Sequence, residues 1–173
     1  MCIQVKRGDC LVAKNINLDL TGTGFCASFN FRRTARAITR LYDSRLMASG
    51  IRSTQFAILV GIAKNQPVPI AALADMLVTD QTTLSRSLRL LQKQGLITIS
   101  GRSTMRQRFL AITPKGERTL QRTLPLWRKM QADFISKVGS NQWHELRNEL
   151  ENIARFAIDD AKTQSTSAHG PRE

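Results

Sequence analysis

Apolar positions recur at helical spacing over the first half of the chain. Between residues 26 and 49, side chains three or four positions apart form one apolar face, from Phe31 to Leu46, and Gly50 is the expected stop. A second helix is predicted over residues 55–63, with Ser53 as its N-cap, and its apolar residues point in nearly every direction. That second helix is therefore expected to be buried on most sides.

The pattern then changes to two short helices separated by a turn. The first is predicted from Ile70 to Leu77, and the second begins after Asp80, whose carboxylate can cap it, and stops at Gly95. One face of the second helix is an inward stripe of leucines at positions 84, 88 and 91. Two short amphipathic helices in this arrangement are typical of a helix-turn-helix motif.

Alternating residues after Gly95 predict two β-strands that flank a basic loop near residues 101–108. Val68, in the break between residues 65 and 69, is expected to pair with them as a third strand. A hairpin with a cationic tip beside a helix-turn-helix predicts a winged helix. The fold class expected is mostly α with a small β-wing (α+β).

Two long amphipathic helices are predicted after the hairpin. The first starts at Thr113-Pro114, is bent by Pro125 and ends at Val138, and the second covers residues 141–161. Together they expose more apolar surface than so small a winged helix can cover, which predicts a homodimer. The polar segment 162–173 is expected to be a disordered tail.

The positive charge of the chain also predicts a binding partner. The net charge is +13 and the pI about 10.8, which favours binding to a polyanion such as double-stranded DNA. From residue 81 to residue 118 the only acid is Glu117, against eight cations: Arg86, Arg89, Lys93, Arg102, Arg106, Arg108, Lys115 and Arg118. Solvated faces usually mix both signs, so this patch favours phosphate.

The predicted DNA-binding residues come from the second short helix and the loop. On the helix they are the hydroxyls and cations opposite the leucines: Thr82, Thr83, Ser85, Arg86, Arg89 and Lys93. In the loop and its edges they are Arg102, Arg106 and Arg108. Arginines can read guanine with two hydrogen bonds, whereas hydroxyls suit phosphates or base edges.

Several of these segments resemble the MarR family of bacterial transcription regulators. The similarity rests on Thr54-Gln55-Phe56, Leu73-Ala74, Thr82-Thr83-Leu84-Ser85-Arg86, Gly95-Leu96-Ile97 and Ile112-Thr113-Pro114-Lys115-Gly116, and extends over residues 29–160. It implies a winged-helix dimer whose terminal helices are interleaved. The family's wing often carries Asp-x-Arg, and the matching residues here are Thr104, Met105 and Arg106, so the acid is missing.

The resemblance also implies a pocket for a small aromatic or anionic effector, in the crease between the dimer helices and the winged helix. Residues that could line it are Arg36, Tyr42, Phe56 and Trp127, although their spacing fits an ordinary core equally well. Release from DNA by such an effector would make the protein a ligand-responsive repressor of a palindromic operator.

The three cysteines have no zinc-like spacing with the two histidines, so no metal or other cofactor is expected. Free thiols are the simplest interpretation. The alternative is that Cys26 is reactive, because a cysteine at a helix N-terminus near arginines is stabilised as a thiolate. In the peroxide-sensing branch of the same family the reactive cysteine aligns with Ser28 instead, so a peroxide sensor that uses Cys26 stays an alternative.

No nucleotide-binding, hydrolase or protease motif is present, so an enzyme is not expected. No apolar run is long enough for a membrane span, and a cytoplasmic location is expected. A non-specific architectural nucleic-acid binder remains the competing function. The expected organisation is an N-terminal arm (1–24), a dimerisation helix (25–50), a DNA-binding domain (51–113), two dimerisation helices (114–161) and the tail (162–173).

Overall fold

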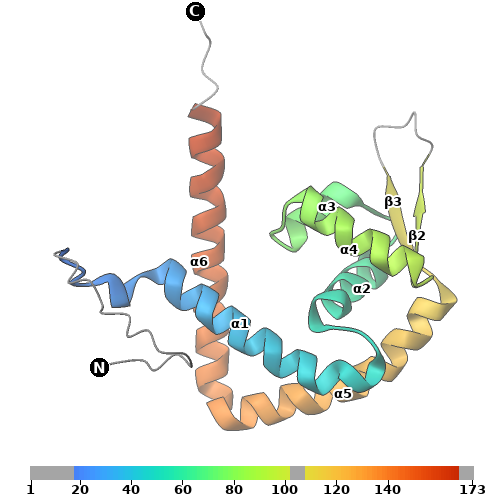
Figure 1. Ribbon diagram of the computed structural model, residues 1–173, viewed down its shortest axis with the longest axis horizontal. Coiled ribbons are helices and arrows are strands. Elements are labelled where there is room, and N and C mark those ends of the chain that lie inside the picture. The colour runs from blue at the N-terminus through green and yellow to red at the C-terminus, as the bar shows by residue number, and fades with distance from the viewer. Residues whose placement is uncertain (1–17, 102–107, 168–173) are drawn as a thin grey trace, which may run out of the picture. The chain divides into compact units, whose positions relative to one another are not determined.

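The computed structural model describes residues 18–101 and 108–167 (Figure 1), and its contacts divide the chain into a unit up to Ile38 and a unit from Thr39 onward. Most of the described chain is helical, with one small antiparallel sheet, so the predicted mostly α winged helix is confirmed. The first unit holds the short 3-10 helix η1, Thr23–Phe25, and the start of α1, Ala27–Leu46. In it the Asn30 side-chain amide donates to the carbonyl oxygens of Gly24 and Cys26, both at 3.0 Å.

The second unit begins with the end of α1 and a sharp corner into α2. After α1 a 3-10 turn, η2 at Met47–Ser49, leads to Gly50, whose φ of 81° reverses the chain. Helix α2 covers Ser53–Asn65, two residues longer at each end than predicted. Ser53 is not its N-cap as expected, because that hydroxyl donates to Asp43 of α1 at 2.6 Å.

Helix α2 lies at the centre of the core. Leu59 and Ile62 are fully buried, and they pack in one cluster with Leu73 and Leu110 from the helix-turn-helix and the sheet. Gly61 allows this close approach, since a Cβ there would lie 2.8 Å from the Leu73 Cδ1 atom. The predicted burial of α2 is therefore confirmed.

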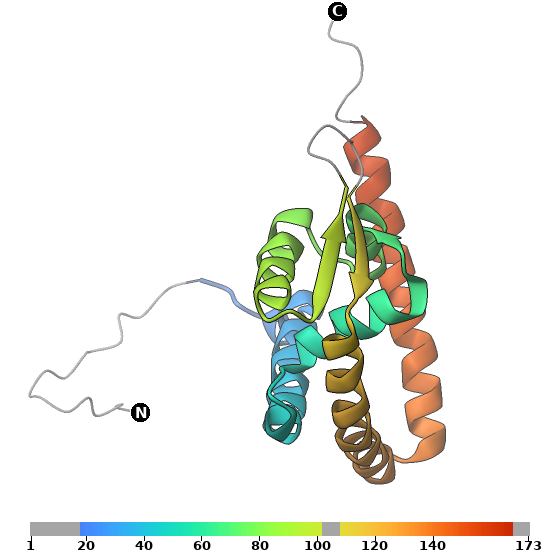
Figure 2. The same cartoon turned by 90° about the vertical axis from the view of Figure 1, so that its right-hand side faces the viewer.

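The sheet contains three short strands, and helix α4, Gln81–Lys93, packs beside one of them (Figure 2). Strand β1, Val68–Pro69, pairs with β3, Phe109–Ile112, which in turn pairs with β2, Ile97–Ser100, all antiparallel. Val68 lies opposite Leu110, so the predicted third strand is confirmed. Its pairing ties the break after α2 to the base of the wing.

Helix α5, Pro114–Val138, leaves the sheet through a capped and tightly packed corner. The Thr113 hydroxyl accepts the Gly116 N–H at 3.0 Å, and a Cβ at position 116 would overlap the Leu96 carbonyl oxygen. Gly116 is therefore required because its backbone lies against the backbone of Leu96, just before β2. Figure 1 shows α5 as a curved helix, and Pro125, the residue expected to bend it, lies inside the helix.

Helix α6, Ser140–Ser167, continues six residues past the predicted end at Ala161. The expected disordered tail was wrong for residues 162–167, and residues 168–173 lie outside the described part of the chain. At the corner with α5, the Phe134 and Trp143 rings meet edge to face with centroids 5.2 Å apart.

Within residues 18–101 and 108–167, no single helix is long and apolar enough to cross a membrane. Only the pair Ala27–Ser49 and Ser53–Asn65, bent by 74°, reaches that length and composition together.

Candidate nucleic-acid interface

The helix-turn-helix consists of α3, Ile70–Met76, and α4, Gln81–Lys93. Asp80 caps α4 as predicted, accepting the Thr83 N–H at 2.7 Å. Hydrogen bonds from the side chain and the N–H of Thr83 lower the pKa of Asp80, so its charge is held at the helix N-terminus. Asp80 therefore caps the N-terminus of α4, and α4 itself contains no carboxylate.

The two faces of α4 differ as the sequence predicts. Leu84, Leu88 and Leu91 are at most 2% exposed and anchor the helix in the core. The remaining predicted residues of α4 are exposed, except the half-buried Ser85: Thr82, Thr83, Arg86, Arg89 and Lys93. The core therefore holds the helix so that hydroxyls and cations project into solvent.

A hollow of about 210 Å³ separates α4 from the sheet. Arg89 of α4 and Arg108, the residue before β3, both line it, so two arginines from distant parts of the chain share one depression. Its other lining residues are Ile70, Ser85, Leu88, Gln92 and Ile99. Paired guanidiniums above an apolar floor are suited to a phosphate group.

Gln92 belongs to this surface although the sequence analysis did not select it. It follows Ser85 and Arg89 at helical spacing, i, i+4 and i+7, and that spacing could have identified it. Its amide can donate and accept, which suits contact with a base edge or a phosphate.

The base of the wing is fixed, and its tip is not described. The Arg108 carbonyl oxygen accepts the Ile70 N–H at 3.2 Å, which joins the start of β3 to the start of α3. Arg102 and Arg106 lie outside the described residues, as do Thr104 and Met105 of the altered wing motif. Their roles therefore stay predictions from the sequence.

Of the residues predicted for an effector pocket, the structure brings two into contact. The rings of Phe56 and Trp127 lie 6.0 Å apart between centroids, at 31°, and both pack with the core. Tyr42 donates its hydroxyl to Gln131 of α5 at 2.6 Å, and partial burial raises the pKa of this tyrosine. Arg36 is exposed and belongs to the first unit.

Cys26 is a free, exposed thiol that directly precedes α1. Its carbonyl oxygen accepts the backbone N–H of Asn30 at 3.1 Å. No group of three or more His, Cys, Asp or Glu that could hold a metal ion occurs among the residues the structure describes.

These features define a class of protein. A helix-turn-helix whose second helix presents hydroxyls and cations, beside a strand hairpin with Arg108 directly before its second strand, is a winged-helix DNA-binding module. Comparison with known proteins agrees: residues 49–104 match a model of the MarR family.

Solved structures extend the match beyond that module. The chain is 32% identical to the M. tuberculosis transcriptional regulator MosR in complex with DNA, with a TM-score of 0.70 over 78% of this chain and 97% of MosR. PcaV of Streptomyces coelicolor, solved with its natural ligand, has the same fold at 16% identity, with a TM-score of 0.70 and coverage of 81% and 99%.

Curated relatives lead to the same conclusion. An HTH-type transcriptional regulator of Staphylococcus aureus is 26% identical over 129 residues, which is 73% of this chain and 88% of that protein. The chain belongs to the MarR family of DNA-binding transcriptional regulators, and it is not an enzyme.

Proposed function

We propose that this protein is a homodimeric repressor that binds a palindromic operator and is released by a small-molecule or oxidant signal. The observation that carries the proposal is the exposed, carboxylate-free face of α4, with Arg89 paired across the 210 Å³ hollow with Arg108 at the wing base. In this arrangement α4 enters the major groove and the wing follows the neighbouring backbone or minor groove.

Individual roles follow from position and chemistry. Thr82, Thr83 and Ser85 stand at the first turn of α4, where hydroxyls contact phosphates or base edges. Arg86 and Arg89 read guanine, and Lys93, about one helical turn after Arg89, contacts a phosphate. Arg106 inserts into the minor groove, and Arg102 and Arg108 hold the adjacent backbone.

A second copy of the chain is proposed to cover the apolar face of α6. Leu146, Leu150, Ile153 and Phe156 recur at helical spacing, and 36–73% of each side chain is exposed in the single chain. A continuous apolar row of this kind is typical of an interface. We assign residues 25–50 and 114–161 to dimerisation and 51–113 to DNA binding.

Dimer symmetry leads to a prediction about the DNA site. Two copies of α4 related by a two-fold axis would read half-sites about one helical turn apart, roughly 34–36 Å. MosR is solved with DNA, which supports DNA binding as a function for this chain. Phe56, Trp127 and Tyr42 are the proposed contacts of an aromatic effector.

Selection of bound sequences from a random DNA pool tests the proposal. A palindromic motif with half-sites one turn apart is the expected result. Recovery of no common motif at moderate salt would instead identify a non-specific architectural protein, which shares the basic charge but reads no bases.

A further inference from the structure

The C-terminal end of α4 is joined to the start of α5 by three hydrogen bonds. They run from Thr113 and Lys115 to three consecutive carbonyl oxygens, those of Gln94, Gly95 and Leu96. The Thr113 hydroxyl donates to Gly95 at 2.7 Å, and the Thr113 N–H donates to Leu96 at 3.1 Å. The third donor is the Lys115 ammonium, whose Nζ atom lies 2.8 Å from the Gln94 oxygen. A lysine of α5 therefore binds the end of α4.

The chemistry of this contact suits both partners. The last carbonyl groups of a helix have no donor within the helix and form the negative end of its dipole, so a cation there is stabilising. Gln94 is the C-cap of α4, and Lys115 lies in the first turn of α5, directly before the buried Gly116. The stem of the lysine passes over Gly95, since a Cβ at that position would lie 3.8 Å from the Lys115 Cδ atom. Lys115 is thus held through its backbone, its stem and its ammonium.

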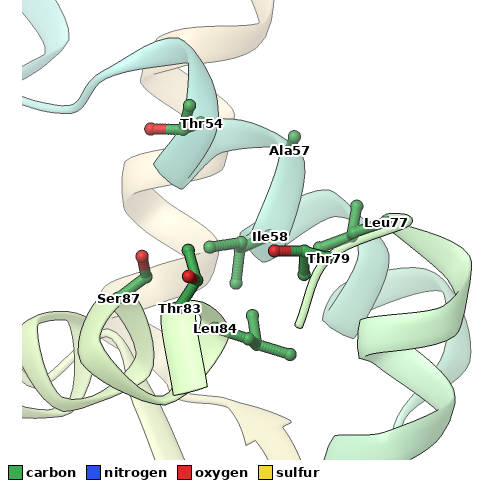
Figure 3. Close-up of a pocket in the computed structure, with 8 residues that line it drawn as sticks. All are labelled: Thr54, Ala57, Ile58, Leu77, Thr79, Thr83, Leu84 and Ser87. Atoms are coloured by element: carbon green, nitrogen blue, oxygen red, sulfur yellow. The ribbon is translucent and has the colours of Figure 1, made fainter. Parts of the chain in front are cut away.

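Helix α4 is not held equally on all sides. Its inward stripe of leucines is buried, but a pocket of about 320 Å³ lies between the N-terminal half of α4 and α2. Figure 3 shows Thr83 and Ser87 of α4 on the side of this space that faces Ile58 of α2. Because packing is open there, the orientation of α4 depends more on how its two ends are fixed. Asp80 caps the first end, and Lys115 binds the second.

We propose that Lys115 is a positioning residue for base reading: its ammonium holds the C-terminal end of α4 against α5 and does not contact a phosphate. The inference rests on the proposed function, in which α4 reads the bases. It gives Lys115 a different role from the one that the charge pattern indicates for this region, because the ammonium already donates to a protein acceptor.

The two roles differ in which DNA they favour. A phosphate contact strengthens binding to every sequence, because the DNA backbone is the same in all of them. A positioning residue favours the site whose bases must meet α4 in one orientation, since a helix that is already oriented loses less freedom on binding. Loss of Lys115 should therefore reduce the preference for the specific site more than the affinity for other DNA.

The first experiment tests the contact in the full chain without DNA. Lys115→Met keeps an apolar stem and removes the ammonium, so amide hydrogen exchange at Gln94 and Gly95 should become about threefold faster. Exchange at Thr83, at the other end of α4, should not change. Arg122→Met removes an exposed cation about two turns further along α5 and, as the matched control, should exchange like the parent. Unchanged exchange at Gln94 in Lys115→Met, or equal acceleration along the whole of α4, would overturn the contact.

The second experiment measures affinity for the DNA selected from the random pool and for a scrambled duplex of equal length, over a range of salt concentrations. For Lys115→Met we expect the ratio of the two affinities to fall about threefold, with an unchanged salt slope on the scrambled duplex. Lys115→Arg, which keeps a charged donor, should restore the ratio. Lys93→Met, at a proposed phosphate contact, should weaken both duplexes alike and reduce the slope by about one charge.

The outcomes separate this inference from the proposed function. Equal weakening of both duplexes by Lys115→Met, with a reduced salt slope, would identify a phosphate contact and overturn the positioning role. A full affinity ratio in Lys115→Met would also overturn that role and leave the proposed function standing. A parent protein that does not distinguish the two duplexes would overturn the proposed function, and with it the role of Lys115 in base reading.

Discussion

The carboxylate of Asp43, near the end of α1, accepts two hydrogen bonds from Ser53 at the start of α2: the N–H at 2.7 Å and the hydroxyl at 2.6 Å. These bonds span the chain reversal at Gly50 and join the two helices. The Ser53 hydroxyl, the Ser53 N–H and the neighbouring Arg52 charge lower the pKa of Asp43, which is therefore ionised in the folded protein at neutral pH.

Asp43→Asn is expected to destabilise the fold by about 1–3 kcal/mol, since hydrogen bonds to a charged acceptor are lost. Because folding lowers the pKa, the ionised form contributes stability above the pKa of the unfolded chain. That contribution disappears as the pH falls through the lower folded value. Urea unfolding at a series of pH values should therefore show a difference between parent and variant that shrinks below about pH 4. A difference that stays constant into acid would contradict this assignment.

Two basic residues are expected to affect DNA binding in different ways. Arg106→Ala should weaken operator binding by on the order of 1–3 kcal/mol, because a minor-groove arginine senses groove width and sequence. Lys93→Ala should weaken all sequences alike and reduce the salt slope by about one charge. Gel-shift titrations over a range of salt concentrations measure both effects. Parent-like binding by Arg106→Ala would remove the wing from the interface.

The apolar row of α6 predicts the effect of a charge placed at its C-terminal end. Phe156 is 73% exposed in the single chain, so Phe156→Glu should leave the subunit folded while a buried carboxylate weakens the dimer by about tenfold or more. Sedimentation velocity at several concentrations measures the change. Asn148→Glu, on the other side of α6, is the matched control and should behave as the parent. A monomeric parent protein would exclude the dimer altogether.

Cys26 is exposed directly before α1, which keeps the oxidant-release hypothesis open to test. Mild peroxide should lower operator affinity, and Cys26→Ser should abolish that response while leaving affinity in the absence of peroxide unchanged. Cys2→Ser and Cys10→Ser, at positions outside the described residues, serve as comparisons. A response that persists in Cys26→Ser would remove this thiol from the mechanism.

The features predicted correctly from sequence are those fixed by local chemistry. Asp80 caps α4 because its carboxylate reaches an N–H three residues ahead, and Gly95, with a φ of 71°, adopts the conformation that ends the helix. The buried leucines of α4 follow helical period. Even the three-stranded sheet was predicted, since Val68 lies in an extended break between two well-marked helices.

The features that the sequence did not predict depend on contacts between residues that are far apart in the chain. Serine is a common N-cap residue, but the Ser53 hydroxyl donates to Asp43, ten residues earlier in the chain. The N-cap of α2 is Arg52, whose N–H donates to the side chain of Gln55. The hollow lined by Arg89 and Arg108 is a product of packing, which no local pattern displays.

The end of α6 was missed for a different reason. Polar composition after residue 161 was interpreted as disorder, yet side chains four positions apart extend the helix. Thr163 donates to the Asp159 carbonyl oxygen at 3.0 Å, and Gln164 donates to the Asp160 carboxylate at 2.8 Å.

Repeating the random-pool selection with Arg89→Ala decides whether the exposed face of α4 reads bases. The motif selected by this variant should lose preference at one symmetric pair of positions, at a cost of about 1–3 kcal/mol for the parent site, while the rest of the motif stays intact. A motif identical to that of the parent would contradict the claim, because α4 would then not be the element that reads the sequence through Arg89.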